Sequence, residues 1–229
     1  MLVAFVVGVA SSLIASVVVL LAGWFLSGAF RRFLIRFVGK MCGSDVEDIY
    51  PTQAIANPDV AKELRMARRV CFFGGRGNEL TRETFAALWA SDNRRLETVR
   101  ILLPDPSSST RDSWLSRRER EMETYDRGYV GSMIETQIRS NIQYLMNKTR
   151  DRSDIEVRLY DFPHLGRIVM TDQVAFVTPY TDRAHGSESR CLRLRSSGPL
   201  YNFAERIFSE AWSTARVITP ESTDIGSTE

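Results

Sequence analysis

The sequence predicts an α/β protein in which one N-terminal transmembrane helix precedes a single domain with a mixed β-sheet and helices on both faces. Residues 1–30 carry no charged side chain, and a spanning helix needs about 20 apolar residues. Behind them, short apolar runs alternate with segments of helical periodicity, which is typical of a sheet covered by helices. The roughly 200 residues after the apolar run are enough for one domain.

Basic residues determine the predicted orientation. Arg31, Arg32, Arg36 and Lys40 directly follow the uncharged run, whereas a cleaved signal peptide would carry its positive charge in front. By the positive-inside rule the N-terminus lies outside and the C-terminal domain lies in the cytoplasm, at an inner or plasma membrane. The chain has a net charge of +2, so residues 41–229 carry about −2, which argues against a generally basic nucleic-acid module.

Small residues recur every fourth position in the predicted membrane helix, at Ala4, Gly8, Ser12 and Ser16. Small side chains at this spacing allow two membrane helices to pack closely. They therefore predict a homo-oligomer. The alternative, that small residues are simply common in membrane helices, stays open.

The rest of the chain divides into three parts. Residues 31–57 are expected to form a basic juxtamembrane segment and linker, residues 58–217 the cytoplasmic domain, and residues 218–229 a disordered acidic tail. Strands are expected at 69–73, 97–103, 155–160, 167–171, 174–178 and 191–195. Helices are expected at 57–66, 81–89, 112–148 (with an interruption near Gly128 and Gly131) and 199–217.

The cysteine and histidine content excludes several kinds of site. The three cysteines, Cys42, Cys71 and Cys191, have no metal-ligand spacing, and the chain has only two histidines. We therefore expect no metal and no cofactor. Unpaired cysteines in apolar runs are typical of a reducing compartment.

The most informative segment is residues 161–180, where the chain resembles the phospholipase D-like superfamily. That family's signature is His-x-Lys, four residues, Asp, six residues and Gly-Ser. Aligned on Asp172, Arg167 takes the place of the phosphate-orienting lysine, and Leu165 stands where the family has its nucleophilic histidine. Pro179 and Tyr180 replace Gly-Ser. The resemblance covers residues 58–217 and implies the fold predicted above.

The departures from the signature decide the expected chemistry. His164 is one residue early, and on a strand such a shift turns a side chain to the opposite face. Family members hydrolyse phosphodiesters with two histidines, so the resemblance implies an inactive domain that keeps an anion site around Arg167 and Asp172. An active homodimer that uses His164 is the alternative. A ligand-free membrane docking module is another.

Other residues are candidate ligand contacts. Arg158, Arg193 and Arg195 lie on predicted strands, and a glycine-rich loop follows the first strand with Gly75, Arg76, Gly77 and Asn78. Backbone N–H groups of such a loop can bind a phosphate. The alternative is purely structural: the arginines would be solvated charges on strands, and the glycine-rich loop would be a simple turn.

Together these features predict a membrane-anchored sensor or effector. A nucleotide or short oligonucleotide would bind the domain and bias the packing or opening of the membrane helices. The arrangement is similar to membrane effectors of bacterial antiphage defence, in which a partner enzyme produces the ligand.

Overall fold

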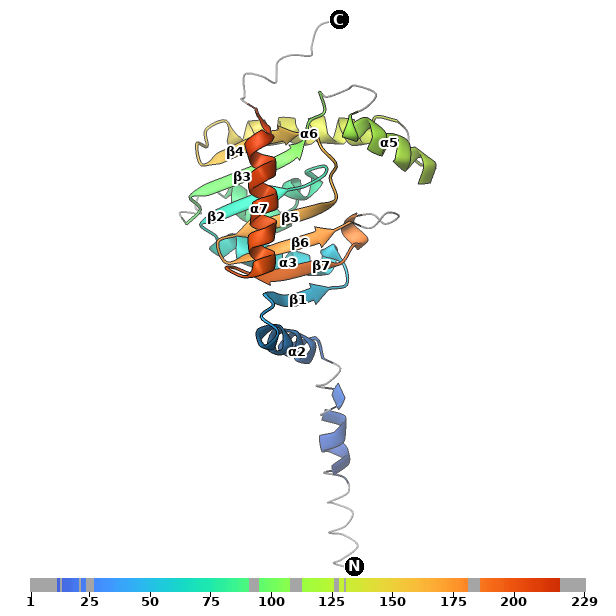
Figure 1. The fold of residues 1–229 in the computed structure, drawn as a ribbon, viewed down its shortest axis with the longest axis vertical. Helices are drawn as coiled ribbons and strands as arrows, with labels where there is room; N and C mark the ends of the chain where they lie inside the picture. The colour runs from blue at the N-terminus through green and yellow to red at the C-terminus, as the bar shows by residue number, and fades with distance from the viewer. Residues whose placement is uncertain are drawn as a thin grey trace, which may run out of the picture.

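The computed structural model describes residues 12, 14–20, 22–23, 27–90, 95–107, 113–125, 128–129, 131–180 and 186–218. Element labels follow Figure 1. Eight strands form one sheet: β1 (Val46–Tyr50), β2 (Arg69–Phe73), β3 (Thr98–Pro104), β4 (Ile155–Tyr160), β5 (Gly166–Thr171), β6 (Val174–Pro179), β7 (Cys191–Arg195) and β8 (Arg216–Val217). The helices are α2 (Gly28–Met41), α3 (Gln53–Met66), α4 (Ala86–Trp89), α5 (Trp114–Tyr125), α6 (Met133–Thr149) and α7 (Pro199–Thr214). Short 3-10 turns are η1 (Asn78–Thr81), η2 (Glu83–Phe85) and η3 (Gly186–Glu188).

The sheet is mixed, with the strand order β1-β7-β6-β5-β2-β3-β4-β8. The strands β2, β3 and β4 are parallel, and the other pairs are antiparallel. Because β5 runs against β2, the start of β5 and the end of β6 lie at the edge where β2, β3 and β4 end. We call this the carboxyl edge of the sheet.

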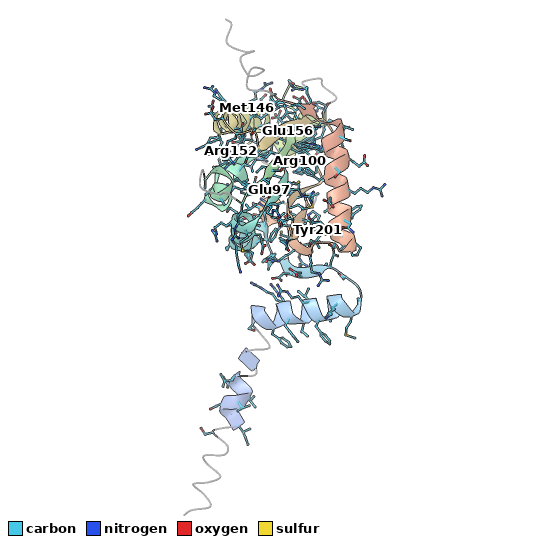
Figure 2. All side chains as sticks on the ribbon, turned by 90° about the vertical axis from the view of Figure 1, so that its left-hand side faces the viewer. Glu97, Arg100, Met146, Arg152, Glu156 and Tyr201 are labelled. Atoms are coloured by element: carbon cyan, nitrogen blue, oxygen red, sulfur yellow. The ribbon has the colours of Figure 1, made fainter. Side chains whose placement is uncertain are left out.

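Helices cover both faces, as the sequence predicts. α3, α5 and α6 pack with the short turns on one face, around Phe72, Ile101 and Phe176. α7 covers the other face, where Phe208 and Trp212 pack against Phe73 and its neighbours. Figures 1 and 2 show α7 alone on its side of the sheet.

Residues 31–57, expected to be a juxtamembrane segment and linker, contain regular secondary structure. This segment contains the amphipathic helix α2 and the edge strand β1, which pairs with β7. Figure 2 shows α2 running across the end of the domain. α3 also begins earlier than expected, at Gln53, because Thr52 caps it by accepting a hydrogen bond from Ile55 N. Pro58 lies inside that helix, where it leaves one helix hydrogen bond unmade.

Two further expectations need correction. The expected helix at 81–89 is divided: Thr81 ends a 3-10 turn, Glu83–Phe85 forms another, and Ala86–Trp89 forms one α-helical turn. The last helix ends at Thr214, and Arg216–Val217 then pairs with β4. The expected tail, residues 218–229, lies almost wholly outside the described residues.

The predicted membrane helix remains a prediction, since most of residues 1–30 lie outside the described part of the chain. Within the described part, no helix is both long and apolar enough to cross a bilayer. Of the small residues predicted to pack, Ala4 and Gly8 lie outside it. Ser16 is described, and its hydroxyl donates a hydrogen bond to the carbonyl of Ser12, 2.9 Å away.

Candidate anion-binding site

The carboxyl edge brings together His164, Arg167 and the glycine-rich loop. Phe73 ends β2, and the loop that starts at Gly74 follows it. Tyr160 ends β4, and its hydroxyl donates a hydrogen bond to Gly74 O over 3.1 Å. The chain then turns through His164 into β5. Residues far apart in the sequence thus meet at one edge because β2 and β4 are parallel and β5 is antiparallel.

His164 is buried in a box of aromatic rings. Only 7 % of the residue is exposed. Ring centroids lie at 4.8 Å (Phe73), 5.3 Å (Tyr180), 5.8 Å (Tyr160) and 6.0 Å (Trp114). Gly75 completes the box, because a Cβ there would lie 2.8 Å from the imidazole Cδ2.

The imidazole of His164 is neutral and has no hydrogen-bond partner. Neither ring nitrogen bonds to any described residue. Burial, with a smaller contribution from the charge of Arg118, lowers the pKa of His164 to about 3. A buried polar group without a partner costs free energy, so these two nitrogens mark a place where a polar group from outside would be stabilised.

His164, and not Leu165, faces the interior. Leu165 occupies the nucleophile position of the phospholipase D-like signature, yet it is 77 % exposed. The two neighbouring side chains therefore point in different directions, and both residues precede the first residue of β5. The inward orientation places the imidazole at the edge even though the signature is out of register.

Arg167 is another buried polar group of the edge. It lies on β5 and is 1 % exposed. The amide oxygen of Gln53, in the orientation that satisfies both amide atoms, accepts hydrogen bonds from Arg167 Nη1 and Nη2. Glu79 Oε1 lies 3.8 Å from Nη1, and Arg167 Nε has no partner among the described residues. Burial lowers the pKa of Arg167, but a guanidinium stays protonated in proteins.

The glycine-rich loop is fixed from α6. Asn141 Nδ2 donates hydrogen bonds to Arg76 O (2.8 Å) and to Asn78 Oδ1 (2.6 Å). Arg76 Nη1 donates to Gln137 Oε1 over 3.3 Å. Gly77 has φ +79°, a left-handed conformation that favours glycine. The loop therefore holds Arg76 half-exposed beside α6.

Tyr180 connects the two buried groups. Its ring contacts His164, and burial raises the pKa of Tyr180 to about 12. The positive charges of Arg167, Arg76 and Arg118 act on it in the opposite direction. The phenol therefore stays protonated at neutral pH and can donate a hydrogen bond to an anion.

The structure places the remaining predicted contacts away from this cluster. Asp172 follows the far end of β5, where its Oδ1 accepts a hydrogen bond from Arg68 N (3.0 Å). Arg158 stacks on Trp212 beneath α7 and pairs with a glutamate on its own strand. Ion pairs with Glu47 and Glu63 hold Arg193, and Arg195 is exposed on β7.

Sequence reasoning missed several residues of the cluster. Gln53, Trp114, Glu79 and Asn141 were not identified, because their roles depend on contacts across the fold. Gln53 directly follows the capping residue Thr52, but no local pattern links it to Arg167. Among the described residues no group of three or more His, Cys, Asp and Glu side chains could hold a metal ion.

Residues 65–214, well over half of the chain, match the protein-family model described as "Domain of unknown function (DUF5919)". The chain belongs to this DUF5919 family. The DUF5919 region starts near the end of α3, ends with α7 and includes the whole carboxyl edge except Gln53. No functionally curated protein matches the chain.

Two solved structures are similar to the DUF5919 chain. One is TrmBL2, an archaeal chromatin protein that binds DNA, with 11 % identity and a TM-score of 0.46 over 83 % of this chain and 62 % of that one. The other is Nuc from Salmonella typhimurium, a phospholipase D family member, with 11 % identity and a TM-score of 0.47 over 75 % of this chain and 97 % of that one. This chain therefore spans about 62 % of the length of TrmBL2.

Proposed function

We propose that the protein is a membrane-anchored, catalytically inactive phospholipase D-like sensor. It binds a phosphodiester ligand, a nucleotide or short oligonucleotide, at the carboxyl edge and couples binding to the packing of its membrane helices. One observation carries the proposal: within the described residues, Nε of the buried Arg167 and both ring nitrogens of the buried His164 have no hydrogen-bond partner, and the two residues lie at the same edge.

The charges of the edge suit an anion. The carboxylate nearest to Arg167, that of Glu79, is 3.8 Å away, which leaves the guanidinium poorly compensated. Arg76 is half-exposed, and its positive charge acts on Tyr180, as that of Arg167 does. A phosphodiester would therefore contact Arg76, Asn78 and Tyr180 directly, while Arg167 supplies positive charge from below. Such charge acts strongly because its surroundings exclude water.

Catalysis is not supported by this arrangement. A nucleophilic histidine needs an acceptor that holds one ring N–H, so that the other nitrogen presents its lone pair. No described residue accepts from His164. Asp172, the acidic residue of the signature, lies beyond the far end of β5, a distance of about five strand residues from Arg167, or roughly 16 Å.

The proposal can be tested by binding. The full chain in lipid nanodiscs would be titrated against a fluorescein-labelled strand of four deoxythymidines, with anisotropy as the readout. We expect Arg76→Gln and Arg167→Gln each to weaken binding by about tenfold or more, which corresponds to about 1.4 kcal/mol. Arg158→Gln is the matched control, because this arginine is also partly buried on a strand but lies on the α7 face. It should leave the affinity unchanged.

Equal affinity in all four proteins would contradict the proposal. Because Arg167 is buried, its variant needs a melting curve beside the titration, whereas Arg76 can be replaced without opening the core. Raised salt should also weaken binding, since phosphate contacts release counterions.

The second candidate is a phosphodiesterase that acts as a homodimer. It is favoured by the inward orientation of His164 and by its neutral imidazole, the protonation state that a nucleophile requires. If the full chain hydrolyses bis(p-nitrophenyl) phosphate and the His164→Leu variant does not, the protein is this enzyme and not an inactive sensor.

A further inference from the structure

Helix α2 has two different faces. One face packs on β1: Gly39 is buried there, and a Cβ at Gly39 would lie 3.2 Å from Val46 O. Ile35, one turn earlier, is half-buried on the same side. The opposite face is an apolar stripe, which consists of the exposed residues Phe33, Leu34, Phe37, Val38 and Met41.

Ion pairs fix this orientation. Arg32 Nε lies 2.9 Å from Asp48 Oδ2, and Arg31 Nη2 lies 3.7 Å from Asp48 Oδ1. Asp48 is 1 % exposed, so the helix is tied to a buried carboxylate of β1. A buried carboxylate is strongly destabilising when its ion-pair partners are removed. The apolar stripe is therefore held away from the domain and cannot turn inward to bury itself.

The charges of α2 identify what covers the stripe. The helix contains no Asp or Glu. Arg36 and Lys40 lie beside the stripe, and within the described residues no carboxylate pairs with either of them. Basic residues beside an apolar helix face match an anionic lipid surface, where acyl chains receive the apolar groups and headgroups receive the cations.

The chain that leads into α2 points to the same surface. The uncharged run of residues 2–30 reaches into the first turn of the helix. A 14-residue helix is about 21 Å long, so the entire stripe can lie along a bilayer surface immediately after the chain leaves it.

We infer that α2 lies in the plane of the cytoplasmic bilayer interface and docks the domain on anionic lipid. The stripe enters the boundary between headgroups and acyl chains, roughly 5–10 Å deep, while Arg36 and Lys40 contact anionic headgroups. β1 then becomes the membrane-proximal edge of the sheet. This docking rests on the proposed membrane location but is independent of the ligand and of the carboxyl edge.

Site-directed spin labelling tests this docking. Cys71 and Cys191 are buried and Cys42 is exposed, so a Cys42→Ser background directs the label to one introduced cysteine. The full chain would carry the label at Phe37→Cys on the stripe or, as the matched control, at Glu210→Cys on the exposed side of α7. Both would be measured in phosphatidylcholine vesicles with about 30 % phosphatidylglycerol.

We expect the two labelled sites to differ in which relaxation agent reaches them. The label at position 37 should be relaxed by oxygen more than by a water-soluble nickel chelate, and the label at 210 by nickel more than by oxygen. The double variant Arg36→Glu, Lys40→Glu should make the label at position 37 more accessible to the nickel chelate in these vesicles. The increase should be smaller in pure phosphatidylcholine vesicles.

Two outcomes would overturn the docking. Nickel accessibility at position 37, in protein that floats with the vesicles, would leave the stripe in water. Spin–spin broadening at position 37 that persists in detergent would show a second copy of the chain on the stripe. Protein that does not float with vesicles would instead contradict the membrane location itself, and the oligonucleotide titration would be unaffected by any of these results.

Discussion

At the residue scale, His164 and Arg167 are stabilised by different means. The imidazole is surrounded by rings and Gly75 and makes no hydrogen bond with the described residues. The guanidinium is held through one amide, that of Gln53. Burial opposes the charged form of both groups. His164 responds by remaining neutral, whereas Arg167 cannot, so a buried positive charge remains at the edge.

Because His164 is neutral in the folded chain, we expect the free energy of unfolding to decrease as the pH falls. The unfolded chain takes up this proton near pH 6.5, and the folded chain only near pH 3. The contribution of the neutral imidazole is therefore complete above pH 6.5 and is lost as the pH falls toward 3. The free energy of unfolding should decrease by about 2 kcal/mol between pH 6.5 and pH 5 from this group alone.

His164→Leu provides the comparison, since leucine has a similar volume and no titrating group. Thermal unfolding of both full chains in the same detergent, at pH 7 and pH 5, measures the difference. The variant should lose less stability on acidification than the parent chain. An equal loss in both proteins would mean that other groups produce the effect.

Gly75 supports a second prediction at this scale. Its added Cβ would lie 2.8 Å from the His164 ring, so Gly75→Ala must displace the imidazole or the loop. We expect a loss of about 1–3 kcal/mol of unfolding free energy, measured by chemical denaturation. Gly28→Ala is the control, because a Cβ there meets nothing within 4 Å and alanine favours helix.

The sequence identifies part of this site, and the fold explains the rest. Arg167 and the loop Gly75–Asn78 could be named because a charge and a glycine cluster are visible along the chain. The partners of Arg167 could not, because Gln53 lies 114 positions away in the sequence and reaches it only after β1 joins the sheet. Asp172 was grouped with Arg167 by the spacing of the signature, yet the length of β5 separates them.

At the element scale, α7 is capped by a residue from the other end of the domain. Its own N-cap, Gly198, has no side chain. Asp45 instead accepts hydrogen bonds from Leu200 N (3.3 Å) and Tyr201 N (2.7 Å). A carboxylate at a helix N-terminus also interacts favourably with the helix dipole. This contact joins the start of β1 to the helix that covers the other face.

Removal of this cap should destabilise the domain. Asp45→Ala leaves two backbone N–H groups without their acceptor, which should cost about 1–2 kcal/mol; Asp45→Asn, which keeps one acceptor oxygen, should cost less. Gly198→Ala should be worse than either, because its Cβ would overlap Asp45 Cβ. Urea unfolding of the three variants would rank their losses of unfolding free energy. An Asp45→Ala variant as stable as the parent chain would disprove the capping role.

Elements with strong periodicity were predictable and those with mixed composition were not. The strands Arg69–Phe73 and Ile155–Tyr160 have the expected bounds, because each is a short run dominated by apolar residues. β1 was missed because its sequence, VEDIY, contains two acidic residues. Asp48 is buried, pairs with Arg31 and Arg32 from α2 and accepts a hydrogen bond from Ile49 N, and such partners are not visible in the sequence.

At the scale of the whole molecule, self-association of the predicted membrane helices can be tested separately. Gly8→Leu should disrupt close packing, because a large side chain keeps two backbones apart. Size-exclusion chromatography with light scattering in detergent would measure the mass of the complex. Leu2→Ile, outside the small-residue stripe, serves as the control, and an unchanged mass for Gly8→Leu would exclude this stripe as the interface.

The short peptide from β1 to the first residue of α3 contacts two distant parts of the molecule. Asp48 pairs with Arg31 and Arg32 of α2, and Gln53, five positions later, accepts hydrogen bonds from the guanidinium of Arg167. A shift of this strand along its own axis would displace both contacts at once. Thermodynamic linkage then requires reciprocity: if seating on lipid changes the affinity for an anion by some factor, the anion changes the seating by that same factor.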